Sequence, residues 1–232
     1  MRNALAGLRA SADRIRKITF DIDANIALAL QDRDVLQRHQ TTQCALTVIL
    51  SGYLESFLKE VAEAFVSEIN TLKIPFSALP DRMQRAHFEV GGQILTNRMR
   101  NRLEWVSSSP NEIARRLGSV SSFPYELVWE AFADTKQNPG PDTIEDYLFR
   151  FGLKKPWFSV TSKVVVRKSS WSKNTITTRL RSFIQVRNEC AHSGQASIIP
   201  TPNDVREYCE LIEEIGPAIN IYDRFWTEIK SK

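Results

Sequence analysis

NTITTRLRSFIQVRNECAHSG, residues 174–194, is the stretch of sequence that decides the fold class. Its apolar side chains recur every three or four positions, which predicts a helix with a buried stripe: Ile176, Leu180, Phe183 and Cys190. Arg187 occupies one position of this stripe. A guanidinium is costly to bury without a partner, so its presence here marks the helix as a candidate functional element. Ser193 and Gly194 predict that the helix ends just after His192.

The composition is that of a globular chain with enough apolar side chains for a core. Of 232 residues, 42% are hydrophobic and 25% are charged. The three cysteines, an odd number without a CxxC pair, argue against a disulfide framework or a zinc site and favour a reducing compartment. The first 17 residues lack the apolar block of a secretory signal, and the longest apolar run, 45–50, is too short for a membrane span. We therefore expect a cytoplasmic protein with no membrane partner.

The positive charge is concentrated immediately before the motif. The formal net charge is +4, but residues 150–188 hold ten Lys or Arg and no Asp or Glu. This region could attract phosphates, or its counter-charges could lie nearby in the folded chain. If the region attracts phosphates, the predicted RNA-binding residues are Lys168, Lys173, Arg179 and Arg181. The aromatic side chains of this region could stack on unpaired bases or pack in the core: Trp157, Phe158 and Trp171.

Two helices are predicted before the motif, over residues 4–38 and 42–70. The second has the stronger apolar stripe, with the i, i+3, i+4, i+7 spacing of a core-facing helix. The last helix is predicted over 202–215, with a proline at its first position and a break at Gly216-Pro217 that leads into 218–229.

The middle of the chain, about residues 71–172, is predicted to be mostly helical and inserted between core helices. Helices are expected over 81–105, interrupted near Gly91-Gly92, and over 111–117, 124–133 and 144–151, with a linker at 137–141. Residues 160–168 are expected to form a loop or short strand because of three consecutive valines. The whole predicts an all-α helical bundle, a single domain over 1–232 with a core at about 4–70 and 174–230.

The segment Arg187-Asn188-Glu189-Cys190-Ala191-His192 resembles the R-x4-6-H signature of the HEPN superfamily. In that superfamily a polar residue commonly follows the arginine, and the ending Ala-His-Ser-Gly looks like the Ala-His-Gly ending common in the group. The strong early helix and the final amphipathic helix agree with this resemblance, which covers roughly 42–70 and 174–229.

The resemblance implies a fold, an activity and partners. HEPN families are small helical bundles that usually dimerise, and many are metal-independent endoribonucleases that act as toxins or in antiphage defence. The implied partners are an RNA substrate, a second copy of the chain, and an antitoxin or defence-system protein. No cofactor and no metal are implied.

A second segment, Arg82 to His87, also fits the R-x4-H pattern. It starts a helix after Pro80-Asp81, and it lacks both the polar residue after the arginine and the small residues after the histidine. We therefore favour the later segment. The structural alternative there is that His192 only caps a helix C-terminus, with Arg187 in an ion pair.

Helix geometry limits what one copy of the motif can do. At about 100° per residue, Asn188 and His192 share one flank, whereas Arg187 lies about 140° from His192. Both can reach one phosphate only if the helix unwinds near Ala191 or a second subunit supplies the other half. We expect a composite cleft at a two-fold interface.

These residues suit RNA cleavage by attack of the 2′-hydroxyl on the adjacent phosphate. His192 would serve as general acid or base and Arg187 would stabilise the transition-state charge. Asn188 would orient His192 or hold a phosphate oxygen. Glu189 would pair with the partner subunit's Arg187 or face water. Cys190 lies on the apolar stripe and is expected to be a core residue.

Three functional hypotheses follow. The first is a HEPN-type endoribonuclease, a toxin or defence effector. The second is a non-catalytic module that binds RNA, a nucleotide or a protein and uses Arg187 as an anchor. The third is a structural adaptor, in which Arg187 would be buried against an acid of its own monomer.

Overall fold

The computed structural model describes residues 2–72, 74–101, 109–121, 124–135, 139–193, 196–219 and 221. Within these ranges the chain contains helices and connecting segments but no strand, which confirms the all-α class. No helix in the same ranges has the length and apolar character needed to cross a membrane. The helices are α1 (Arg2–Ala24), α2 (Ile26–Ala29), α3 (Arg33–Thr71), η1 (Phe76–Ala78), α4 (Asp81–Asn101), α5 (Pro110–Gly118), η2 (Ser119–Ser121), α6 (Glu130–Ala133), α7 (Pro141–Arg150), α8 (Pro156–Arg167), α9 (Lys173–Ser193) and α10 (Pro202–Ala218).

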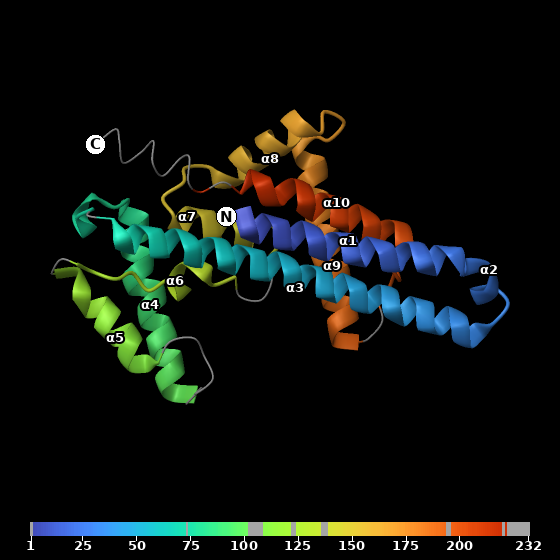
Figure 1. The fold of residues 1–232 in the computed structure, drawn as a ribbon, viewed down its shortest axis with the longest axis horizontal. Coiled ribbons are helices and arrows are strands. Elements are labelled where there is room, and N and C mark those ends of the chain that lie inside the picture. Colours follow the sequence, from blue (N-terminus) through green and yellow to red (C-terminus); the bar gives the residue numbers. More distant parts are fainter. Residues whose placement is uncertain are drawn as a thin grey trace.

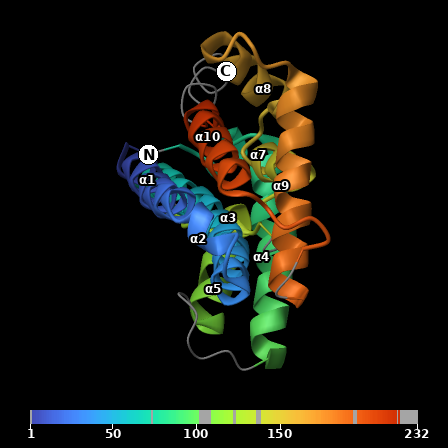
Figure 2. The same cartoon turned by 90° about the vertical axis from the view of Figure 1, so that its right-hand side faces the viewer.

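The 39-residue helix α3 is the long axis of the molecule (Figure 1). Its apolar side chains follow the helical repeat and are fully buried over several turns, as at Leu50, Leu54, Leu58 and Val61. Helices α1, α6, α9 and α10 all pack against it. Figures 1 and 2 together show that α9 crosses α3 at a steep angle, so the motif helix rests on the middle of the core.

The first and last described helices pack side by side over α3. Gly216 of α10 makes this approach close, because a Cβ atom there would lie 2.9 Å from a methyl carbon of Leu8. Ion pairs between α1 and α10 border the contact, Arg16 with Glu213 and Arg206 with Asp23. Helices α1 and α10 thereby form one layer with α3, on which α9 is supported.

The middle region joins the same hydrophobic core. The Tyr147 hydroxyl of α7 donates to the Leu58 carbonyl of α3 at 2.8 Å. Phe151 packs against Phe65 of α3 and against Phe132 of α6, with ring centroids 5.3 Å apart in each pair. Helix α7, whose start borders the motif helix, is therefore fixed to α3.

The predicted helix over 4–38 is wrong, because the chain turns back within it. Helix α1 ends at Ala24, and α3 begins at Arg33 rather than at Thr42. The side chain of Asp32 caps α3 by accepting hydrogen bonds from the backbone amides of Asp34 and Val35. Residues 25–32, which form this turn, include no glycine or proline that could have predicted it.

The predicted loop or strand over 160–168 is also wrong, because residues 160–167 lie in α8 and Lys168 is its C-cap. Pro156 starts the helix at its first turn. Val164 is fully buried, whereas Val166 is 84% exposed, as expected for one face of a helix. Packing outweighs the modest helix penalty of β-branched side chains.

Other boundaries differ from the predictions. Helix α4 continues through Gly91 and Gly92, α10 continues to Ala218 with Pro217 in its last turn, and α6 begins only at Glu130. Gly91 allows close packing, since its Cβ would lie 3.1 Å from a methyl carbon of Leu117. The predicted helical stretch 102–105, most of 218–229 and residues 137–138 of the predicted linker lie outside the described residues.

Candidate functional site

The motif lies on α9, which is helical throughout residues 173–193. The Ser172 hydroxyl accepts a hydrogen bond from the Thr175 amide at the start of the helix. The apolar stripe is buried as predicted, with Ile176, Leu180 and Phe183 fully inaccessible. This burial fixes the rotation of α9 and hence the direction of every polar side chain on it.

Arg187 is half-buried and has no carboxylate partner within the described part of the chain. Its Nη1 donates to the side-chain oxygen of Asn188 at 3.0 Å. Its Nε is buried without a hydrogen-bond acceptor in the described residues. A buried, unsatisfied N–H is unfavourable by about 1–3 kcal/mol. The internal ion pair that the structural adaptor requires is not formed among these residues.

His192 lies on the last turn of α9 with its side chain exposed to solvent. The backbone is helical through Ala191, so the first of the two alternatives, unwinding near Ala191, is not observed, and Gly194 lies outside the described residues. Asn188 and His192 therefore share one flank of the helix. Arg187 starts about 140° around the axis from His192, and its guanidinium reaches back to Asn188. No hydrogen bond joins the arginine to the histidine among the described residues.

Glu189 binds Ser197, a residue that follows α9 in the chain. Its carboxylate accepts hydrogen bonds from the Ser197 amide at 2.8 Å, from the Ser197 hydroxyl at 2.7 Å and from the Gln185 amide at 3.2 Å. The bonds from Ser197 lower the pKa of Glu189 below its ordinary value. This contact within one chain was neither of the two roles predicted for Glu189.

Cys190 is buried against Cys44 of α3, in a small apolar cluster with Val48 and Val186. Burial, reinforced by the hydrogen bond with Cys44, raises the pKa of Cys190 to about 12. A thiol of this kind is a poor nucleophile. The predicted core role of Cys190 agrees with this environment.

Most of the predicted RNA-binding cations are occupied within the chain. Lys168 pairs with Glu210 at 2.7 Å and Arg179 with Glu207 at 3.9 Å, both carboxylates lying on α10. Lys173 stacks on the ring of Phe158, with its Nζ 3.3 Å from the centroid. The acidic face of α10 thus supplies counter-charges for a stretch that has none of its own.

The aromatic side chains of the basic stretch also have partners within the chain. The Trp157 indole donates to the Thr177 hydroxyl at 3.0 Å, and Trp171 lies beneath the Arg179 guanidinium with only 8% of its surface exposed. Phe158, which is 60% exposed, carries Lys173 on its ring. Each of the three aromatic side chains thus has a contact within the chain, and no stacked nucleobase is needed to explain its position.

The competing segment in α4 does not form a site. His87 is inaccessible to solvent, and its Nδ1 accepts a hydrogen bond from the Val128 amide at 3.1 Å. Burial lowers the pKa of His87 to about 4. Arg82 points to the ring of Phe149, with its guanidinium carbon 4.1 Å from the centroid. His87 is a neutral core residue, which leaves the later segment as the candidate.

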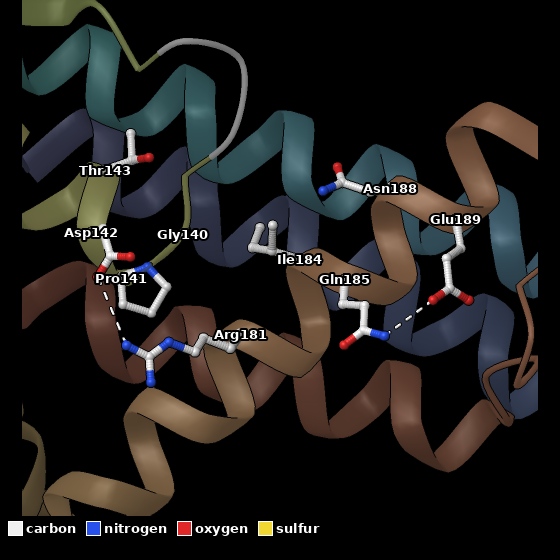
Figure 3. A pocket seen from close by; sticks show the side chains of 9 residues that line it. All are labelled: Gly140, Pro141, Asp142, Thr143, Arg181, Ile184, Gln185, Asn188 and Glu189. Atoms are coloured by element: carbon white, nitrogen blue, oxygen red, sulfur yellow. Dashed lines mark hydrogen bonds and ion pairs between the residues drawn. The ribbon is translucent and has the colours of Figure 1, made fainter.

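A pocket of about 390 Å³ opens beside the motif, between α9 and the start of α7 (Figure 3). Its lining residues are Gly140, Pro141, Asp142, Thr143, Arg181, Ile184, Gln185, Asn188 and Glu189. Of the predicted basic residues, only Arg181 belongs to this lining. Sequence reasoning missed the contribution of α7, because its approach to α9 depends on the tertiary fold. The shared helical face of Arg181, Gln185 and Asn188 was available from their spacing.

Comparison with known proteins yields one family. Residues 9–222 match the family model described as RiboL-PSP-HEPN. No curated protein and no solved structure matches the chain.

Proposed function

We propose that this chain, which belongs to the RiboL-PSP-HEPN family, is a metal-independent endoribonuclease with Arg187, Asn188 and His192 as its catalytic residues. Membership of a HEPN family is compatible with RNase activity. The observation that carries the proposal is the state of Arg187. Its guanidinium is partly buried, lacks a carboxylate among the described residues, and holds a buried N–H without an acceptor. An anionic ligand would satisfy that group.

The reaction is a transesterification within the RNA strand. The 2′-oxygen loses its proton to a general base and forms a bond to the adjacent phosphorus. The bond from phosphorus to the 5′-oxygen breaks, and that oxygen takes a proton from a general acid. The products are a 2′,3′-cyclic phosphate and a 5′-hydroxyl. His192 is accessible for either proton transfer, and Arg187 stabilises the negative charge on the phosphoryl oxygens.

The active form that we propose is a homodimer. Because α9 stays helical through Ala191, Arg187 and His192 of one chain lie on different sides of the helix. A two-fold axis beside α9 would place His192 of one subunit next to the partner subunit's Arg187. Asn188, which already accepts a hydrogen bond from Arg187, would hold the guanidinium in position.

The biological role that we propose is a cytoplasmic toxin or antiphage effector that a partner protein neutralises. Expression of the wild-type chain in bacteria should arrest growth, and expression of His192→Ala should not. If both chains are tolerated equally at matched protein levels, the toxin role is wrong.

The nuclease proposal is tested by cleavage of total RNA in the presence of EDTA. We expect Arg187→Ala and His192→Ala each to lower the rate at least 100-fold, the usual range for loss of a general acid or a charge-stabilising group. Arg9→Ala removes an exposed guanidinium of α1 and serves as the matched control. Circular dichroism and sedimentation should show an unchanged fold and oligomeric state.

Two results would contradict this assignment. One is wild-type protein that cuts no RNA under any of these conditions. The other is an Arg187→Ala/His192→Ala double variant that cuts as fast as wild type. RNA binding without cleavage would instead support the alternative of a non-catalytic binding module, which the separation of Arg187 and His192 within one chain also allows.

A further inference from the structure

The pocket between α7 and α9 shares a face of the motif helix with His192. Arg181, Gln185, Asn188 and His192 follow one another at intervals of four, three and four residues. At a rise of ~1.5 Å per residue, this stripe is about 16 Å long. Figure 3 shows the side chains of Arg181, Gln185 and Asn188 along the same side of α9. A ligand in the pocket would therefore extend along the helix toward His192.

The pocket walls combine an apolar surface with amide groups. Pro141 and Ile184 supply the apolar part, and both are largely buried. Gln185 and Asn188 supply side-chain amides. The Gln185 nitrogen donates to Glu189 and the Asn188 oxygen accepts from Arg187, so the Gln185 oxygen remains as an acceptor and the Asn188 nitrogen as a donor. A nucleobase has the same combination, with apolar faces and a hydrogen-bonding edge.

Arg181 is the cation at the end of the pocket that is farther from His192 along α9. Its side chain is 63% exposed, and that of its partner Asp142 is 90% exposed. The distance from Arg181 Nη2 to Asp142 Oδ1 is 3.8 Å, which is long for an ion pair. Such surface pairs are weak. The guanidinium is therefore available to a phosphate, unlike Lys168, whose 2.7 Å pair with Glu210 engages it.

Two carboxylates also line the pocket, and their positions fit a nucleotide. Glu189 is engaged by Ser197 and Gln185, which confines its charge to the side of the pocket nearest the end of α9. Asp142 lies beside Arg181 at the exposed rim. A base on the Gln185 amide would lie beside Glu189, whose oxygens already accept from Gln185 and Ser197. A phosphate on the guanidinium would compete with the exposed Asp142.

We propose that this pocket binds one unpaired nucleotide of the RNA substrate, with its base between Pro141 and the amides and its phosphate on Arg181. The proposal rests on the nuclease function proposed above and adds a specificity subsite to it. The strand must be single-stranded there, because a base within a duplex cannot enter a pocket. The neighbouring nucleotide then lies along the stripe toward Asn188 and His192.

The test measures binding of a 5′-labelled single-stranded oligoribonucleotide by fluorescence anisotropy. His192→Ala is the background, so that the probe stays intact. Adding Arg181→Ala should weaken binding roughly tenfold, as expected for loss of a charged hydrogen bond, and should flatten the salt dependence. Adding Gln185→Ala should weaken binding and change the order of affinity among homopolymeric probes. Arg9→Ala is the control and should leave the affinity unchanged.

Cleavage by the otherwise wild-type chain separates this proposal from the nuclease proposal. If the wild-type protein cuts RNA and the Arg181→Ala and Gln185→Ala variants cut at the same sites and rates, the pocket proposal is wrong and the nuclease stands. If the wild type binds RNA without cutting it and both variants weaken binding, the nuclease is wrong and the pocket stands. Equal loss of affinity for a duplex of the same sequence would also overturn the pocket proposal.

Discussion

His87 and His192 each follow an arginine by five residues, and they meet opposite surroundings. His192 is exposed at the end of α9, whereas His87 is enclosed by the rings of Phe76 and Phe88. The same sequence pattern thus gives one accessible imidazole and one core imidazole. What separates them is the position of each histidine on its helix.

The buried histidine makes stability depend on pH. The folded protein holds the pKa of His87 at about 4, whereas an unfolded chain protonates near 6.5. Its neutral form is therefore fully compatible with the fold above pH 6.5, and stability is lost as the pH falls from 6.5 toward 4. We expect a loss of about 3 kcal/mol from this residue over that range. Urea unfolding at pH 7 and pH 4.5 measures it.

His87→Gln is the comparison for that experiment. The variant will be less stable at both pH values, since a packed ring is removed. The informative quantity is the difference between the two pH values, which should be smaller in the variant by most of the 3 kcal/mol. An unchanged difference would show that His87 does not carry this pH dependence.

At the residue scale, the sequence predicted the core stripe of α9 from local spacing, and it favoured the motif whose histidine is exposed. It could not predict the partner of Glu189. Ser197, eight residues along the chain, donates to that carboxylate, and no rule of local spacing links these two positions. The role of the motif residues in cleavage stays a prediction.

At the scale of the elements, the break between α1 and α3 was the boundary that the sequence pattern did not predict. The break between α1 and α3 has no glycine or proline, and a single side chain, Asp32, stabilises the new start. The spacing of apolar residues predicts one continuous stripe through Ile15, Ile18, Ile22, Ile26 and Leu30. Ile15 and Ile22 are buried, yet Ile18, Ile26 and Leu30 are 40%, 41% and 75% exposed. Periodicity identified the helices well, and it could not show where tertiary contacts end them.

The Asp32 cap can be measured by substitution. Asp32→Ala should lower the free energy of unfolding by about 1 kcal/mol, because two backbone amides at the start of α3 lose their acceptor. Asp21→Ala, which removes an exposed carboxylate within α1, should leave stability unchanged or slightly higher. Chemical denaturation of both variants tests this. Equal stability of the two would show that the cap contributes nothing.

At the scale of the whole molecule, basic side chains of one helix form ion pairs with acidic side chains of another. The basic helices α8 and α9 lie against α10, whose Glu207, Glu210 and Glu214 face them. These pairs neutralise Arg167, Lys168 and Arg179, whereas Lys154 and Lys155 of the same basic stretch stay exposed. A composition count could not reveal this, since the acids lie far along the chain from the bases.

A mixing experiment tests whether the active site spans two subunits. Arg187→Ala and His192→Ala homodimers should each be inactive. After unfolding and refolding together, half of the dimers should be mixed, and one of their two sites would keep both wild-type residues. We expect about a quarter of the wild-type rate to return. Recovery should be absent when either variant is refolded alone.

If mixing restores no activity although mixed dimers form, the composite cleft is wrong. The site would then have to be completed within one chain. A differentially tagged pair, purified through both tags, verifies that mixed dimers are present.

The packing of Cys44 against Cys190 gives the protein a built-in reporter. Both thiols are buried in a small cluster between α3 and α9, apart from the main core that holds Cys209. With the pKa of Cys190 raised to about 12, alkylating reagents reach it as thiolate only when the two helices separate. The order in which the three cysteines become modified would therefore time the local opening of the motif helix against global unfolding, without any engineered label.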